Sequence, residues 1–365
     1  MSRRKNLINN IIYMGLTMVA LAVAIYVCQS RYVVDLGGAL IRFLVGAIIA
    51  ALTATFAHEL GHVIGGKKAG FAFSEMVVWF FKWKREQGGI RFYFTLFGSE
   101  AGYTEMIPKS QENLDKRLKK MTNSALIASF TMILIGLIPM FLTSLSLWGY
   151  CLLVAFLPVG IYSFFGNALP MINEGFLNDG AIVSAIKKGD DSIKVLISLL
   201  CIQAQLYQGK TYAEIDKKYY YDLPQLPEDD PNFIRLLNAR YNYALDNDNL
   251  DEAKTILARM MGLIDDMPKV FEWQIKCDAL YAASTYDFDE DKADELMYEL
   301  EKQLNKRNGV SEIRLKLAYV LNVKKETEPL DMFYSKGVKE ADRCQIKGIG
   351  RFEKKLLDEL VDKNK

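Results

Sequence analysis

The sequence predicts a mainly α-helical, polytopic membrane protein. We expect about four transmembrane helices and a small cytoplasmic β-hairpin or sheet, followed by a soluble α-helical solenoid. Two observations predict this fold class. The first half of the 365 residues contains four apolar segments of membrane length, whereas the second half is strongly charged. In that second half, apolar residues recur with helical spacing in repeated pairs of segments.

The four apolar segments define the membrane part. A helix needs about 20 mainly apolar residues to cross about 30 Å of hydrocarbon. The segments of this length run over residues 8–28, 40–64, 124–145 and 148–172. Each is too apolar to be one face of a soluble amphipathic helix. The sequence therefore predicts a multi-pass protein of the cell membrane, in contact with membrane lipid.

Basic residues beside these segments predict their orientation. Arg3, Arg4 and Lys5 precede the first span, and the connection over residues 66–122 is rich in lysine and arginine. The first external loop offers only Arg31. Because short loops rich in lysine and arginine stay on the cytoplasmic side, we expect both termini to be cytoplasmic.

A β-hairpin is expected in the connection between the second and third spans. Residues 73–83 and 90–97 have the composition of strands and flank the turn Gln87-Gly88-Gly89. In the second strand, apolar and polar residues alternate. The pattern predicts an amphipathic or membrane-skirting hairpin.

The second half is expected to form helix pairs. Helical spacing appears over residues 193–207, and a linker over 223–231 precedes the repeats. The apolar residues that recur about 40 residues later are Ala239, Tyr243, Ala253, Leu257 and Met260, matched by Ala279, Ala283, Ala293, Met297 and Leu300. A looser third pair covers 312–341, and a capping helix covers 352–361.

These pairs resemble tetratricopeptide repeats, a helix-turn-helix family of binding scaffolds. Their period is longer, however, and the tryptophan and glycine positions of that family do not match. The resemblance implies a scaffold that contacts a cytoplasmic protein partner and selects or presents substrate. A spacer that only stabilises the protein is the alternative.

Composition excludes other classes of protein. The net charge of +1 argues against a nucleic-acid partner, since no excess positive charge is available to neutralise phosphates. The five cysteines show no C-x-x-C spacing, so neither a cysteine zinc site nor a disulfide framework is indicated.

The strongest functional motif is His58-Glu59-Leu60-Gly61-His62, near the end of the second span. It contains both histidines of the chain. Residues four apart lie on one face of a helix, so both imidazoles can bind one zinc ion. Glu59 then lies where a general base would take the proton of a zinc-activated water. The alternative, two structural histidines on an ordinary helix, does not explain ionisable side chains in a membrane span.

Asp179 is the candidate for a third zinc ligand, because catalytic zinc sites generally use three protein ligands. It lies in the segment 167–180, at the cytoplasmic end of the fourth span. Pro170 and Gly175 interrupt the helix there, and irregular backbone at membrane depth is expected only beside protein or a wet cavity. An ordinary Asn-Asp-Gly turn that ends a helix is the alternative.

These two motifs resemble the site-2 protease family of intramembrane zinc metalloproteases, over residues 36–185. In that family one span carries His-Glu-x-x-His and a later span carries an Asn-Pro motif that ends in Asp-Gly. The resemblance implies that zinc is bound by His58, His62 and Asp179 and that Glu59 is the catalytic base. It also implies that Asn167 and Pro170 hold the substrate or its oxyanion.

The chain departs from the family pattern in two places. The stretch between Asn167 and Asp179 is longer than the compact family motif, so Asn173 and Glu174 are rivals of Asn167 as substrate contacts. Asn178 stands where leucine is common. The family also implies that the sheet receives substrate as an added strand, which would extend a helical substrate and expose its peptide bond.

The function expected from these patterns is intramembrane zinc endopeptidase. The substrate would be a membrane-embedded peptide or protein cut near the cytoplasmic face, with Glu59 activating a zinc-bound water. A non-catalytic membrane receptor or immunity-type protein, with a structural zinc site and a partner-binding solenoid, is the alternative. The expected parts are an N-terminal span with its external loop (1–35), the metalloprotease core with its β segment (36–185), an amphipathic helix and linker (186–232), and the solenoid (233–365).

Overall fold

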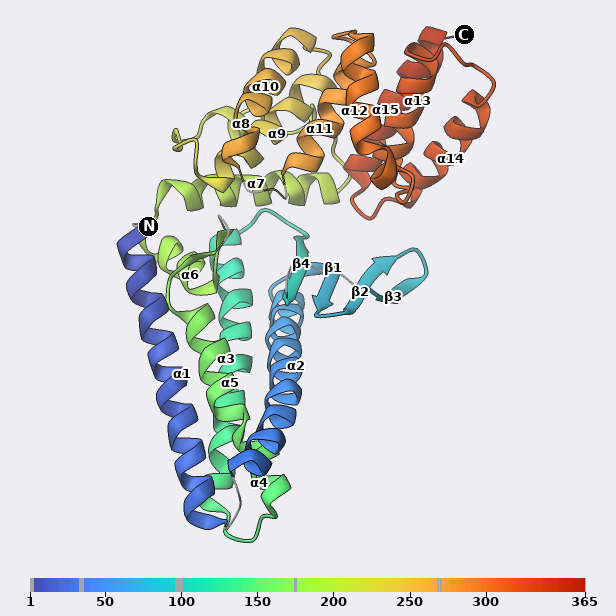
Figure 1. The fold of residues 1–365 in the computed structure, drawn as a ribbon. Helices are drawn as coiled ribbons and strands as arrows, with labels where there is room; N and C mark the ends of the chain where they lie inside the picture. The colour runs from blue at the N-terminus through green and yellow to red at the C-terminus, as the bar shows by residue number, and fades with distance from the viewer. Residues whose placement is uncertain are drawn as a thin grey trace. The chain divides into compact units, whose positions relative to one another are not determined.

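The computed structural model describes residues 3–32, 36–95, 101–173, 176–267, 269 and 271–364. The chain divides into two compact units. The first comprises residues 1–107 and 115–189, and the second comprises 108–114 and 190–365. The long apolar helices and the β-sheet lie in the first unit, and a series of shorter helices forms most of the second (Figure 1).

Four helices in the described part of the chain are long and apolar enough to cross a membrane. These candidate spans are Lys5–Arg31, Gly37–Lys68, Leu114–Phe141 and Leu147–Ala168. They belong to α1 (Arg3–Arg31), α2 (Leu36–Lys68), α3 (Leu114–Phe141) and the pair α4 (Leu147–Val154) and α5 (Phe156–Ala168). The four predicted apolar helices are therefore present.

The fourth helix differs from the prediction at its end. We expected it to continue to residue 172, but α5 ends at Ala168, two residues before Pro170. Proline disfavours helical backbone in the residue before it and cannot donate a backbone hydrogen bond, so the helix stops here. The same chemistry divides α4 from α5, because Pro158 cannot donate to the carbonyl of Val154 one turn earlier.

The helices of the first unit pack through small residues. In Figure 1, α1 runs along α5, while α2 contacts α4 and α5. Ala20 of α1 meets Ile133 of α3 and Leu157 of α5 in one buried cluster. One turn later in α1, the hydroxyl of Tyr150 donates to the carbonyl of Ala24 at 3.1 Å. The outward surfaces stay apolar: Ile11, Val19, Ile41, Ile48, Ile127 and Ile138 are all exposed.

A four-stranded sheet follows α2. Its strands are β1 (Phe71–Val78), β2 (Phe81–Glu86), β3 (Gly89–Phe94) and β4 (Gly102–Pro108), in the order β3-β2-β1-β4. Both β1 with β2 and β2 with β3 are antiparallel. The predicted hairpin at Gly88-Gly89 is therefore present. The single strand predicted over 73–83 is wrong, because the chain turns at Trp79 (φ 54°) and Phe80 between β1 and β2.

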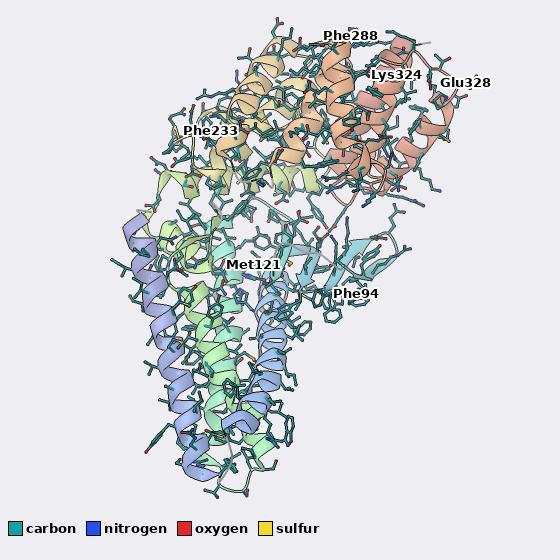
Figure 2. All side chains as sticks on the ribbon, in the orientation of Figure 1. Phe94, Met121, Phe233, Phe288, Lys324 and Glu328 are labelled. Atoms are coloured by element: carbon teal, nitrogen blue, oxygen red, sulfur yellow. The ribbon has the colours of Figure 1, made fainter. Side chains whose placement is uncertain are left out.

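The β2–β3 hairpin has one aromatic and one charged face. Phe81 pairs with Phe94, and Trp83 pairs with Phe92, while Lys82 and Lys84 alternate with them on the opposite face. The ring of Trp83 lies 5.9 Å from that of Phe56 on α2, so the aromatic face joins the apolar surface of this span. Figure 2 labels Phe94, whose ring is 60% exposed on this face.

The second unit is built largely from paired helices. Its elements are α7 (Asp191–Tyr207), α8 (Lys218–Tyr221), α9 (Pro231–Asp246), α10 (Leu250–Gly262), the 3₁₀ turn η1 (Ile264–Asp266), α11 (Glu272–Ala283), α12 (Glu290–Leu304), α13 (Val310–Asn322), α14 (Leu330–Arg343) and α15 (Lys347–Asn364). Consecutive helices pack as α9 with α10, α11 with α12, and α13 with α14. The repeated positions Ala253 and Ala293 are both fully buried, which explains why small side chains recur there.

Two features tie this second unit together. Helix α7 packs against both α9 and α15. It therefore connects the first helix of the first pair with the helix that follows the last pair. The buried Arg314 of α13 donates to Glu353 of α15 at 2.6 Å, and its guanidinium lies 3.9 Å from the ring centre of Tyr281 on α11. Because breaking a buried ion pair leaves an uncompensated charge, these three helices are held in one arrangement.

Candidate metal centre

The motif predicted to bind metal lies within α2, without a break in the helix. His58 and Glu59 are 6% and 5% exposed, and His62 is partly buried. The two imidazole rings are perpendicular, with centres 4.9 Å apart. One turn of helix therefore brings both rings to the same place, as the spacing of four residues predicts.

Asp179 is the first residue of α6 (Asp179–Lys188), which follows the short ladder of β5 (Ile172–Asn173) and β6 (Phe176–Leu177). Its place in the first turn of α6 depends on Asn178, the N-cap residue of that helix. The Asn178 side-chain oxygen accepts from the backbone N–H of Ala181 and of Met171, both at 3.0 Å. Its amide nitrogen donates to the carbonyls of Gly166 and Leu169, both at 2.8 Å.

Asn178 therefore fastens the irregular segment to the end of α5. In the sequence this residue stood out only as a departure from the family motif. Its position directly before an Asp-Gly helix start is typical of an N-cap, and this signal could have identified its role.

Gly180 is required by a close approach of two helices. A Cβ atom there would collide with the carbonyl oxygen of Ala168 and lie 3.0 Å from that of Asn167. The first turn of α6 therefore packs directly on the last turn of α5. A larger residue would push Asp179 away from its observed position.

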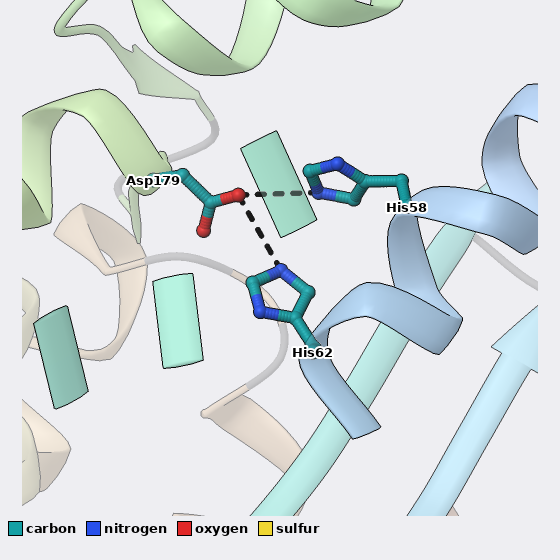
Figure 3. Close-up of side chains that lie close together, drawn as sticks. All are labelled: His58, His62 and Asp179. Atoms are coloured by element: carbon teal, nitrogen blue, oxygen red, sulfur yellow. Dashed lines mark ion pairs between the residues drawn. The ribbon is translucent and has the colours of Figure 1, made fainter. Parts of the chain in front are cut away.

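The three predicted ligands converge, as Figure 3 shows. The Oδ2 atom of Asp179 lies 3.2 Å from His58 Nε2 and 3.4 Å from His62 Nε2. The ligand atoms of the three residues all lie within 4.8 Å of one another. In a tetrahedral zinc site with ligands at 2.0–2.2 Å, neighbouring ligand atoms are about 3.4 Å apart. The two separations that involve Asp179 Oδ2 match this value.

The electrostatics of the three residues also fit a cation. Asp179 Oδ2 and His62 Nδ1 are buried and have no hydrogen-bond partner among the described residues. Burial raises the pKa of the Asp179 carboxyl, but the adjacent imidazoles of His62 and His58 outweigh burial and lower it to about 2. The carboxylate form, which binds metal, is therefore present at neutral pH.

Ser129 of α3 orients His58. Its hydroxyl lies 2.8 Å from His58 Nδ1, and both side chains are buried. A contact to Nδ1 leaves Nε2 as the nitrogen that faces Asp179, which is the usual arrangement of a histidine that binds metal. Gly61 permits this contact, because a Cβ atom there would lie 2.7 Å from the Cα of Ala125 on α3. Sequence reasoning missed Ser129, since one serine in an apolar span carries no periodic signal.

Thr104 of β4 holds the predicted base. Its hydroxyl donates to Glu59 Oε2 at 2.6 Å, and Glu59 Oε1 has no hydrogen-bond partner among the described residues. The edge strand of the sheet therefore fixes one carboxylate oxygen and leaves the other free. Thr104 was also missed by sequence reasoning, because a single threonine in a short strand carries no signal of its partner.

The predicted substrate-contacting residues lie in the α5–α6 segment. The Asn167 amide donates to the carbonyl of Ser163 at 2.9 Å, one turn earlier in α5. The carbonyl of Pro170 accepts from Asn9 of α1 at 2.7 Å. Of the rival residues, Glu174 and the side chain of Asn173 lie outside the described part of the chain. Substrate contact by any of these residues stays a prediction.

Comparison of the chain with protein-family models, curated proteins and solved structures finds no match. The class of site is therefore defined by its own geometry. It is a candidate metal centre of two histidines and one aspartate, with a buried glutamate beside the ligands. One of its elements, α2, is long and apolar enough to cross a membrane.

Proposed function

We propose that this protein is an intramembrane zinc endopeptidase of the site-2 protease type. It hydrolyses peptide bonds of membrane-spanning or membrane-associated substrates near the cytoplasmic face of the cell membrane. The single observation that carries the proposal is Glu59, a buried carboxylate beside three converging ligand side chains. A purely structural zinc site has no use for a base there, so Glu59 favours the enzyme over the receptor.

The membrane setting has two supports. Four described helices have the length and composition of spans, and their outward surfaces are apolar. The basic residues Lys67 and Lys68 end α2, close in sequence to the metal ligands. By the distribution of basic residues, the ligands lie near the cytoplasmic face and both termini are cytoplasmic.

Each residue of the centre has a distinct task in this proposal. His58, His62 and Asp179 hold zinc, and Ser129 keeps His58 in the orientation that binds it. Zinc, when bound, supplies a Lewis acid that acidifies water and polarises the scissile carbonyl. Glu59 accepts the proton of the attacking water and delivers it to the nitrogen of the departing amine, which completes hydrolysis.

The sheet supports a route for substrate. Strand β4 is the end strand in the described order of the sheet, and its Thr104 contacts Glu59. An extended peptide that pairs with an edge strand gains main-chain hydrogen bonds. A substrate segment beside β4 would therefore be unwound and lie next to the base.

Metal removal tests the proposed function directly. Full-length protein in lipid vesicles should cleave a co-reconstituted single-span substrate, lose that activity after chelation, and regain it with stoichiometric zinc. Product is measured by mass spectrometry, which also locates the cut. Activity that survives complete zinc removal would contradict the proposal. Stoichiometric zinc with no cleavage of any single-span substrate would favour the receptor.

Thr104 provides a more specific prediction. Thr104→Val should lower kcat about 10- to 100-fold, because a hydrogen bond to a charged group contributes about 1.5–3 kcal/mol. Thr104→Ser should restore most of the rate, since it keeps the hydroxyl. Zinc content should not change in either variant, because Thr104 contacts the base and not a ligand.

The matched control is Thr95→Val. Thr95 follows β3, and its hydroxyl donates to the carbonyl of Phe80 rather than to Glu59. Its replacement should leave kcat within about twofold of wild type, since surface substitutions usually have small effects. Equal rates for Thr104→Val and Thr95→Val would exclude a role for Thr104 in positioning the base.

A further inference from the structure

The segment that leads to Asp179 is hydrogen-bonded to the N-terminal helix α1. The Asn6 carboxamide makes two bonds to Ile172: its Nδ2 donates to the carbonyl and its Oδ1 accepts from the N–H, both at 3.0 Å. Asn9, one turn later, donates from Nδ2 to the carbonyl of Pro170 at 2.7 Å. These contacts join residues more than 160 positions apart in the sequence.

The two asparagines are unusual for their helix. Helix α1 is apolar enough to cross a membrane, and exposed leucine, isoleucine, valine and methionine side chains cover its outward surface. Asn9 is only 8% exposed. A carboxamide buried in an apolar setting is costly unless its hydrogen bonds are made, and here they are made to one short backbone segment.

The backbone groups of residues 170–172 in turn need hydrogen-bond partners from other parts of the chain. Pro170 ends the helical pattern, and Ile172 directs both its N–H and its carbonyl to Asn6 rather than along a helix. Backbone groups at membrane depth must be satisfied within the protein. Asn6 and Asn9 therefore supply the bonds that a continued α5 would have made.

The connection continues from this segment to the metal ligand. Met171 lies between Pro170 and Ile172, and its N–H donates to the side chain of Asn178. Asn178 also caps the first turn of α6, where Asp179 stands. A shift of the segment 170–172 would therefore move the cap and the carboxylate beside it.

We propose that Asn6 and Asn9 are positioning residues of the metal centre, which hold the segment 170–172 so that Asp179 meets His58 and His62. Helix α1 is thus part of the functional site, although no ligand lies on it. The inference rests on the metal-binding part of the proposed function and does not depend on proteolysis.

The first test follows the backbone of the metal-free protein. In Asn6→Leu and Asn9→Leu, hydrogen–deuterium exchange of a peptide that covers residues 171–177 should accelerate, because the Ile172 N–H loses its acceptor or the Pro170 carbonyl its donor. Asn10→Leu is the matched control, since Asn10 lies on the same helix and forms no hydrogen bond to that segment among the described residues. Unchanged exchange in both Asn6→Leu and Asn9→Leu would overturn the proposal.

The second test measures zinc affinity by competition with a fluorescent chelator. Each of Asn6→Leu and Asn9→Leu should weaken zinc binding about 10- to 100-fold, as found when partners of metal ligands are replaced, while Asn10→Leu should bind as wild type. Asn6→Ala and Asn9→Ala repeat the measurement if a leucine variant is not recovered folded. Faster exchange with unchanged zinc affinity would overturn the positioning role.

These outcomes are separable from those of the proposed function. A wild-type protein that binds zinc but cleaves nothing would refute the protease and leave the inference intact. A wild-type protein that binds no more zinc than His58→Ala would refute the metal centre, and this inference with it, even if exchange at residues 171–177 responds to Asn6.

Discussion

Glu59→Gln should abolish proteolysis while the zinc content stays at the wild-type level. The amide preserves the shape of the side chain and can keep a contact with Thr104, but it cannot accept the proton of the attacking water. Loss of a general base typically costs about 10²- to 10⁴-fold in rate. The measurement is single-turnover cleavage of a reconstituted single-span substrate, with zinc determined on the same preparation.

Glu105→Gln is the matched control for this variant. Glu105 lies on β4, next to Thr104 in the sequence, and accepts from the hydroxyl of Ser74 at 2.7 Å. Its replacement tests the general effect of losing one carboxylate from the sheet, and the rate should stay close to wild type. Cleavage by Glu59→Gln at a rate similar to that of Glu105→Gln would refute catalysis by Glu59.

Removal of any of the three ligands should deplete the protein of zinc. We expect His58→Ala, His62→Ala and Asp179→Asn each to weaken zinc affinity more than 100-fold, because a three-ligand site loses a direct bond to the metal. Ser129→Ala should have a smaller effect, about 10- to 100-fold, since Ser129 acts through His58. Zinc content after dialysis and chelator competition give both values.

The order of these effects separates ligands from supporting residues. Asp179→Asn is the most informative variant, because it keeps the size of the side chain and removes its charge. Full zinc retention in Asp179→Asn would exclude Asp179 as the third ligand. Equal losses of zinc affinity in Ser129→Ala and His58→Ala would mean that His58 binds zinc only when Ser129 holds its imidazole in the observed orientation.

Much of the helical frame could be predicted from the sequence. Membrane-length apolar segments need no partner to be recognised, since their length and composition are local properties. The same holds for His58 and His62, because four residues bring side chains to one face of any helix. Asp179 could be predicted because Pro170 interrupts a span, and the position of that interruption is also local.

Two predicted boundaries of secondary structure were wrong. The predicted strand over 73–83 is two strands, since the apolar run over residues 76–81 continues through the turn at Trp79 and Phe80. The fourth span ends before the predicted residue 172, where Pro170 already forbids a helix. In both cases apolar composition extended further than the regular backbone.

The sequence by itself thus determined the apolar helices and the three candidate metal ligands His58, His62 and Asp179. Only the tertiary structure decided what holds these residues in place. Ser129 contacts His58, and Thr104 donates a hydrogen bond to Glu59. Asn6 and Asn9 donate hydrogen bonds to the segment before Asp179. Each of these contacts joins residues 45 or more positions apart. A single polar side chain becomes a partner only when packing brings a distant group within 3 Å, and no local pattern records that distance.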